Sequence, residues 1–293
     1  MELTPERAKA AAEAVIGECD DHPAARVLAM RTLGLATRFL DGPNPAVVVL
    51  REAVRIASKH NLPQSLAEAK MTYAALLADL GQINAALTEC DEAAALLRGT
   101  SGVVISQRAM ILSRASRAEE ALADYAKALP LLRAARDIHS QCRLYINRSN
   151  LLAYLGRLPA AQRDLQTGIE LARTHGLDNA TGSMIESLGF VMVRRGDIPA
   201  ALRLFAESLT RAYQYNRFNA TYDRAEALLI AGLAGEARDS LEALISDVAN
   251  AGFAVDVAEW HQMLAHAALA EGDPKAARDY AEQALAEFRS QGR

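Results

Sequence analysis

The sequence is poor in aromatic residues, which make up 5% of its 293 residues and include a single tryptophan. A β-sandwich core needs many aromatic and β-branched side chains, so this composition disfavours one. No uninterrupted apolar run reaches about 18 residues, the length expected of a membrane-spanning helix. Apolar residues still form 51% of the chain, with alanine and leucine prominent among them. The composition therefore favours closely packed helices and no membrane partner.

Charge of one sign and cysteine are scarce as well. The formal net charge is −4 with both signs mixed along the chain, so the sequence lacks the basic footprint of a nucleic-acid-binding protein. Its three cysteines, Cys19, Cys90 and Cys142, have no paired spacing, which favours reduced thiols over a disulfide framework. The N-terminal residues contain no basic-then-apolar segment typical of a secretory signal. We expect a cytoplasmic protein without a nucleic-acid partner.

A small residue recurs where the second helix of a repeated helical hairpin would begin. Each occurrence follows a turn sequence such as GRLPA at 156–160 or GDIPA at 196–200. The period is that of helical-hairpin repeats, and Leu188-Gly189 with Ala201 and Phe205 fits the tetratricopeptide pattern. The recurring residues, 35 to 40 positions apart, are Ala46, Ala86, Ala121, Ala161, Ala201, Ala237 and Ala277.

This period predicts an all-α fold of the tetratricopeptide-type α-solenoid, in which helical hairpins form a superhelix. We expect a capping helix within residues 1–24, begun by Thr4 and Pro5, and seven repeats over residues 25–293 as one continuous domain. The second helices are predicted to stop at residues suited to a left-handed conformation, namely Asn61, Gly176, Asn216 and Gly252.

Two positions of the repeat change polarity together. The position before the small residue of the first helix is Leu33 in repeat one and Arg148 in repeat four, and sixteen positions later stand Val49 and Asp164. Such positions are expected to touch within the hairpin, because a partly buried arginine needs a hydrogen-bonded carboxylate. The pattern predicts structural ion pairs Arg108–Asp124 and Arg148–Asp164, and it leaves Asp239 or Ser240 as the partner of Arg224.

Histidine and cysteine pairs are the candidates for metal binding or catalysis. His139 and Cys142, like Cys19 and His22, are spaced as two ligands on one helix, but a stable zinc site needs four ligands, or three and water. No loop sequence for an oxyanion hole and no glycine-rich phosphate loop accompanies them. We expect no metal, no cofactor and no catalytic residue, and hence a protein that is not an enzyme.

Side chains on the first helices of the middle repeats form the candidate binding surface. In stacked hairpins of this type the first helices line a concave groove that binds a peptide or protein segment. Asn, Arg and Tyr can hold a peptide backbone or a carboxylate, and Met and Phe offer apolar contact. The predicted groove residues are Arg143, Asn147, Asn150 and Tyr154 of repeat four, Gln107, Met110 and Arg114 of repeat three, and Glu186, Phe190 and Arg194 of repeat five.

A structural interpretation of the same residues stays open. In it the two asparagines bond neighbouring helices, and Met110 and Phe190 are buried between repeats. Weaker outer stripes contain Arg31, Arg38, Tyr222, Glu226 and His266.

The order of repeat variants resembles a narrower family. From AEAKMTYAALLADLGQINAAL through RLYINRSNLLAYLGRLPAA to the closing AEGDPKAARDYAEQALAEFRSQGR, it is similar to the N-terminal region of bacterial CHAT-domain proteins, over about Ala25 to Arg293. The resemblance implies a sensing or regulatory module ahead of a caspase-like protease domain, whose catalytic His and Cys lie outside this sequence. Glu186-Ser187 departs from the His-Asn expected before Leu-Gly-Phe.

The repeats predict a protein- or peptide-binding scaffold, and the resemblance implies that it regulates a caspase-like domain C-terminal to it or beside it. The last repeat has no capping helix, so we expect the natural reading frame to continue past Arg293. Two alternatives remain, namely the sensor domain of a transcription regulator and a self-assembling scaffold.

Overall fold

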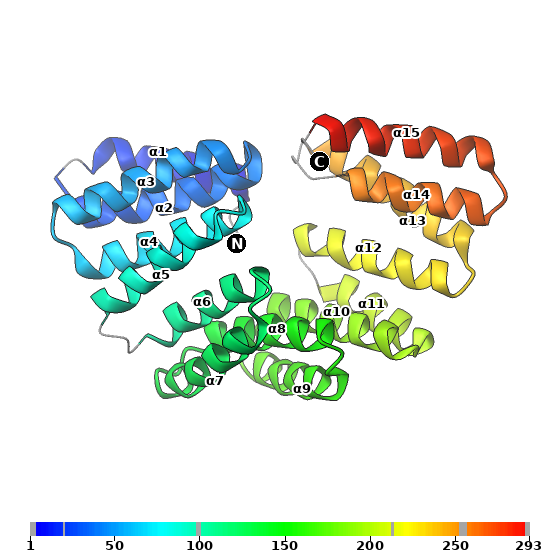
Figure 1. Cartoon of the computed structure of the whole chain (residues 1–293). Coiled ribbons are helices and arrows are strands. Elements are labelled where there is room, and N and C mark those ends of the chain that lie inside the picture. The colour runs from blue at the N-terminus through cyan, green and yellow to red at the C-terminus, as the bar shows by residue number, and fades with distance from the viewer. Residues whose placement is uncertain (1–3, 20, 98–100, 212–213, 252–256, 291–293) are drawn as a thin grey trace. The chain divides into compact units, whose positions relative to one another are not determined.

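The computed structural model describes residues 4–19, 21–97, 101–211, 214–251 and 257–290 (Figure 1). All regular elements within these ranges are α-helices. The chain divides into two compact units, Met1–Leu144 and Tyr145–Arg293, with the boundary inside one helix. Among the described helices, none is long and apolar enough to span a bilayer.

The first unit begins with one helix that precedes the repeats. Its described helices are α1 (Pro5–Glu18), α2 (Pro23–Leu40), α3 (Pro43–Lys59), α4 (Pro63–Asp79), α5 (Ile83–Leu96), α6 (Gly102–Arg114), α7 (Ala118–Ala134) and the first part of α8 (Ile138–Tyr154). The Thr4 hydroxyl accepts a hydrogen bond from the Arg7 amide and so caps α1, which packs against α2.

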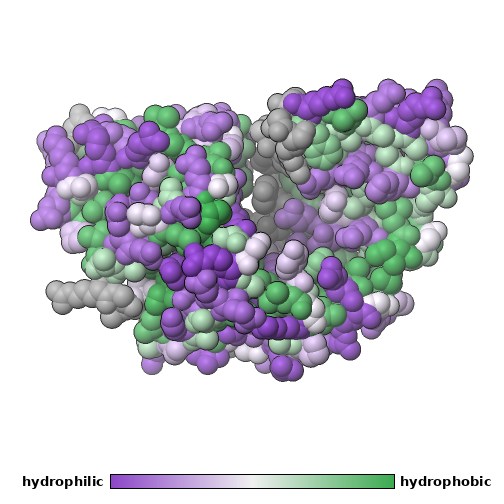
Figure 2. Space-filling view, in the orientation of Figure 1, coloured by the Kyte–Doolittle hydropathy of each residue, from purple (hydrophilic) through white to green (hydrophobic). Residues whose placement is uncertain are grey.

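The second unit continues the alternation of helices. It comprises the rest of α8, α9 (Leu158–Thr174), α10 (Asp178–Arg195), α11 (Ile198–Arg211), α12 (Gln214–Ile230), α13 (Ala234–Ala251), α14 (Ala258–Ala270) and α15 (Pro274–Ser290). Its core includes Trp260, Leu241 and Leu228, which come from three different helices. Side chains over α15 are mainly hydrophilic in Figure 2.

Each repeat is a hairpin of two helices, here called A for the first and B for the second. The A helices are the even-numbered ones from α2 to α14, and each is followed by its B helix. Neighbouring A helices also pack on each other within a unit, as α2 does on α4 and α10 on α12. Six of the seven recurring alanines are fully buried at the start of B helices, and Ala277 of the last repeat is half-buried.

Two hairpins close so tightly that only glycine fits on the A helix. A Cβ atom on Gly34 would lie 2.5 Å from Cδ2 of Leu50, and one on Gly189 would lie 2.6 Å from Cε1 of Phe205. The leucine and the phenyl ring fill the space that a side chain would occupy. The Gly189 and Phe205 contact accounts for the tetratricopeptide pattern in repeat five.

Positive φ angles mark the ends of helices, and two of the four predicted stops are of this kind. Asn61 has φ 52° and Gly176 has φ 66°. The prediction for Asn216 was wrong, because this residue lies inside α12, and the preceding helix already ends at Arg211. Gly252 lies outside the described residues.

Candidate binding surface on the A helices

The arginines that precede the small residue of an A helix form ion pairs or hydrogen bonds within their own hairpins. Arg148 donates from Nε to Oδ2 of Asp164 at 2.7 Å and from Nη2 to Oδ1 at 2.8 Å, and the two side chains are only 18% and 15% exposed. Arg108 is paired with Asp124 through Nη1, and its Nε donates to Oδ1 of Asp91 at 2.9 Å. Both ion pairs expected from the paired substitutions are therefore present, and neither arginine is free to hold a ligand.

The third arginine of this kind also finds a partner that the sequence allowed. Arg224 donates from Nη1 to the Oγ of Ser240 at 3.2 Å. In repeat two the residue at the B-helix position is Glu89, and it accepts from Lys70, one turn before the position used elsewhere, at 2.7 Å. Four hairpins thus have polar side chains where the A and B helices touch at this position. In each of them the A-helix side chain donates a hydrogen bond to the B-helix side chain.

The predicted stripe on α8 has the opposite character. Arg143, Asn150 and Tyr154 are exposed, the tyrosine by 79%, and Asn147 is half-buried. Within the described residues, none of these four side chains makes a hydrogen bond or an ion pair. The spacing i, i+4, i+7, i+11 places them on one face of the helix. Their donors and acceptors are available to a ligand, and the asparagines do not bond neighbouring helices.

The predicted residues on α6 are more engaged. Gln107 and Met110 are half-buried, whereas Arg114 is exposed and forms an ion pair with Asp79 of α4. Asp79 also accepts from Nη2 of Arg38 at 2.6 Å, so one carboxylate joins three consecutive A helices. Arg114 consequently has a structural partner besides any ligand.

On α10 the predicted residues differ in exposure. Arg194 is exposed, and Glu186 and Phe190 are half-buried. Since α6 belongs to the first unit and α10 to the second, a single groove formed by all ten residues stays a prediction.

Sequence reasoning missed an apolar stripe on α2. Leu28, Leu35 and Phe39 are 59%, 43% and 38% exposed. They occupy the positions of repeat one that the exposed α8 residues occupy in repeat four, counted from the small residue of each A helix. Arg31, which was assigned to an outer stripe, instead donates from Nε to the Thr72 hydroxyl of α4 at 3.2 Å. Aligning the repeats on Gly34 would have identified the apolar stripe.

Two carboxyl groups lie at the packing contact between α10 and α12. Burial raises the pKa of Glu186 to about 8, and the charge of Asp223 adds to the shift. Burial likewise raises the pKa of Asp223 to about 7, with Glu226 as the second cause. Neither Glu186 nor Asp223 has a hydrogen-bond or ion-pair partner in the described part of the chain. In the first unit Arg31, at the position that corresponds to Glu186, is instead paired with the oppositely charged Glu68 of the next A helix.

Two of the three thiols are structural. Cys90 and Cys142 are buried, and burial raises the pKa of the Cys90 thiol to about 12, so it stays protonated and unreactive. Within the described ranges, no group of three His, Cys, Asp or Glu side chains could hold a metal ion.

Comparison with solved structures identifies the architecture. A tetratricopeptide repeat protein from Parabacteroides merdae ATCC 43184 superposes with a TM-score of 0.59 at 15% identity, covering 94% of this chain and 93% of that one. The fold is a tetratricopeptide-type α-solenoid. No protein-family model and no curated protein matches the sequence.

Two further solved structures share the fold. The Cut9–Hcn1 hetero-tetramer of the APC/C matches with a TM-score of 0.69 at 14% identity, over 97% of this chain and 50% of the other. The apo quorum sensor NprR from B. thuringiensis matches with a TM-score of 0.58 at 11% identity, over 90% of this chain and 87% of that one. At these identities the likeness concerns the fold alone.

Proposed function

We propose that the protein is a non-enzymatic scaffold that binds a peptide or protein segment on the exposed A-helix face of α8. The observation that carries this proposal is the row of unbonded side chains Arg143, Asn147, Asn150 and Tyr154. In the same helix Arg148 is half-buried and bonded twice to Asp164, so free polar groups are a property of one face. Asparagine amides can pair with a peptide backbone, and an exposed tyrosine offers a large contact area at little entropic cost.

Affinity measurements on variants test this proposal. Binding peptides are first selected from a displayed library with the wild-type protein. Their affinity is then measured for a triple variant, Asn147→Ala, Asn150→Ala and Tyr154→Ala, by isothermal titration. We expect a loss of about tenfold or more, since a hot-spot residue contributes at least 2 kcal/mol.

The matched control is Gln166→Ala on α9, an exposed amide on a B helix that has no bonded partner among the described residues. It should leave affinity unchanged, and both proteins should keep the wild-type unfolding temperature. Wild-type affinity in the triple variant would remove the α8 face from the site.

The second part of the proposal concerns the context of the scaffold. Its order of repeat variants is similar to that of the region ahead of the protease domain in bacterial CHAT-domain proteins. We infer that ligand binding to the repeats controls a caspase-like domain C-terminal to, or encoded beside, this chain. The structure of a solenoid bound to other subunits, as in the Cut9–Hcn1 hetero-tetramer, is compatible with this role.

The native gene and its neighbours test the regulatory role. A caspase-like domain encoded in frame or next to the repeats supports it, and the selected peptide should then change the protease activity of the complex. A helix-turn-helix in the adjoining sequence would favour the sensor of a transcription regulator instead.

A further inference from the structure

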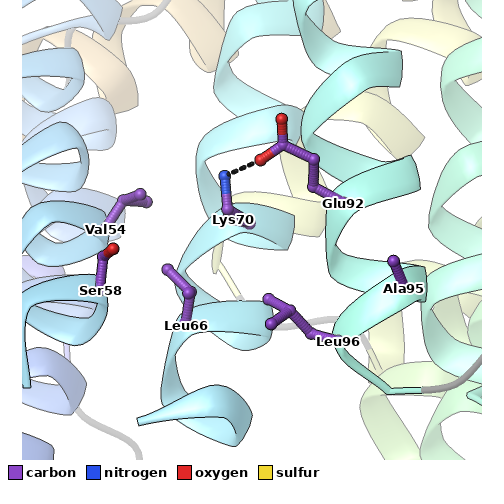
Figure 3. A pocket seen from close by; sticks show the side chains of 7 residues that line it. All are labelled: Val54, Ser58, Leu66, Lys70, Glu92, Ala95 and Leu96. Carbon is purple, nitrogen blue, oxygen red and sulfur yellow. Dashed lines mark hydrogen bonds and ion pairs between the residues drawn. The ribbon is translucent and has the colours of Figure 1, made fainter. Parts of the chain in front are cut away.

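A groove lies between two neighbouring B helices of the first unit. Helices α3 and α5 each pack against α4. The groove lies between α3 and α5, and α4 forms its floor (Figure 3). The groove has a volume of about 520 Å³. Leu66 and Lys70 of α4 face it, whereas Glu68 and Thr72 contact Arg31 of α2. It is therefore on the opposite side of α4 from the A-helix face. The lining residues are Val54, Ser58, Leu66, Lys70, Glu92, Ala95 and Leu96.

The walls of the groove are mainly apolar, and their apolar side chains pack against buried clusters. Val54 and Leu66 pack against the buried cluster that contains Val27 and Ala57. Leu96 packs against a different buried cluster, which contains Ala93. Because each wall is the outer side of a packed core, the groove exists before any ligand binds, and little ordering energy is lost on binding.

A buried ammonium group closes one end of the groove. Lys70 is 9% exposed and donates from Nζ to Glu89 at 2.7 Å and to Glu92 at 2.6 Å. At the equivalent A-helix position repeats one and five carry the apolar residues Met30 and Ile185. Replacing a buried ion pair by apolar residues is often neutral or stabilising, so stability alone does not require the lysine.

The polar end carries a net negative charge. Two carboxylates share one ammonium group, and the Glu92 side chain is 56% exposed. One Glu92 oxygen accepts from Lys70, and the other has no hydrogen-bond partner within the described residues. In Figure 3 the second oxygen points away from Lys70. A cationic group entering beside the apolar walls would find an oriented acceptor, which makes a charge-assisted hydrogen bond.

We propose that this groove binds an amphipathic helix of a partner protein, with apolar side chains against Val54, Leu66 and Leu96 and a lysine or arginine against Glu92. Two helices on either side of an apolar surface that includes Leu66 form the kind of groove in which a helix binds through residues at i, i+3, i+4 and i+7. The negative end selects a basic helix over an acidic one. This site goes beyond the peptide surface of α8 and does not depend on it.

A labelled synthetic peptide tests the proposal by fluorescence anisotropy. The probe is an amphipathic helix with leucines at i, i+3, i+4 and i+7 and one arginine beside them, and its partner probe has glutamate in place of the arginine. The arginine peptide should bind about tenfold or more tightly than the glutamate peptide. Ala95→Trp, which fills the groove from an exposed position, should abolish binding, and Ala126→Trp on the exposed side of α7 should not.

The charge is tested separately. Glu92→Gln should weaken the arginine peptide by about tenfold, and Glu52→Gln, the same position one repeat earlier and outside the groove, should leave it unchanged. The triple α8 variant should bind this peptide normally, so that failure here is distinct from failure at α8. Equal binding of both peptides, binding unaffected by Ala95→Trp, or no binding of the arginine peptide up to about 1 mM would each overturn the proposal.

Discussion

The two carboxyl groups between α10 and α12 should make the second unit less stable as pH rises. Glu186 titrates at about 8 in the folded protein, against an ordinary value of 4.5. Between these pH values the folded state holds a proton that the unfolded chain has released. The free energy of unfolding therefore falls as pH rises. The stabilisation is complete below the ordinary pKa of 4.5 and is lost as pH rises through the folded pKa. Asp223, raised from 3.8 to about 7, acts in the same direction.

The substitution Glu186→Gln removes this penalty without changing the size of the side chain. A shift from 4.5 to about 8, at about 1.4 kcal/mol for each pH unit, sets a ceiling of about 5 kcal/mol. The side chain is only half-buried, so solvent screening reduces this ceiling, and we expect about 1–2 kcal/mol of added stability at pH 8. At about pH 5 the folded wild-type carboxyl is neutral and the unfolded one is only partly ionised, so the gain from the substitution should be much smaller.

Urea unfolding followed by tryptophan fluorescence measures this effect. The single tryptophan, Trp260, is buried in the core of the second unit and so reports on the unit that contains Glu186. Glu282→Gln on the exposed side of α15 is the control and should change stability at neither pH. Equal wild-type stability at pH 5 and pH 8, or a gain from Glu186→Gln of the same size at both, would refute the reasoning.

Three further substitutions or reactions have expected outcomes. Arg148→Ala leaves Asp164 partly buried and unpaired, and should lower the unfolding free energy by about 1–3 kcal/mol in urea titrations, whereas an unchanged midpoint would show that the pair is not structural. Gly189→Ala puts a methyl group against the ring of Phe205, and a thermal scan should show a loss of about 1–3 kcal/mol. Cys90 should resist iodoacetamide at pH 8 until urea is added, since burial raises its pKa to about 12, and labelling of the native protein would contradict its burial.

Local patterns in the sequence were sufficient to predict the hairpins. The recurring alanines mark the start of B helices because a small residue is needed where two helices approach closely. Repeat one has Leu33 and Val49 at the two positions where repeat four has Arg148 and Asp164. This paired change predicted the Arg148–Asp164 ion pair, because both positions lie in one hairpin at a fixed spacing. Contacts within one hairpin can therefore be predicted from the sequence pattern of the repeat.

Interactions between repeats could not be predicted in this way. The meeting of Glu186 with Asp223 depends on how α10 packs on α12, and the groove at Lys70 depends on the space between two B helices. The bond from Lys70 to Glu89 was also not predicted, because the lysine lies one turn before the A-helix position that the arginines occupy in other repeats. Asn216 failed as a helix stop because asparagine also occurs within helices, and the sequence alone does not show which role applies.

The most direct test of the α8 binding face is the NMR signal of its side-chain amides. A selected peptide is added to protein carrying nitrogen-15 in its asparagine and glutamine side chains, and the resonances of Asn147, Asn150 and Gln166 are followed. Binding at the proposed face should shift the two asparagine signals and leave Gln166, on the B helix, unmoved. A peptide that binds while both asparagine signals stay in place would contradict the account.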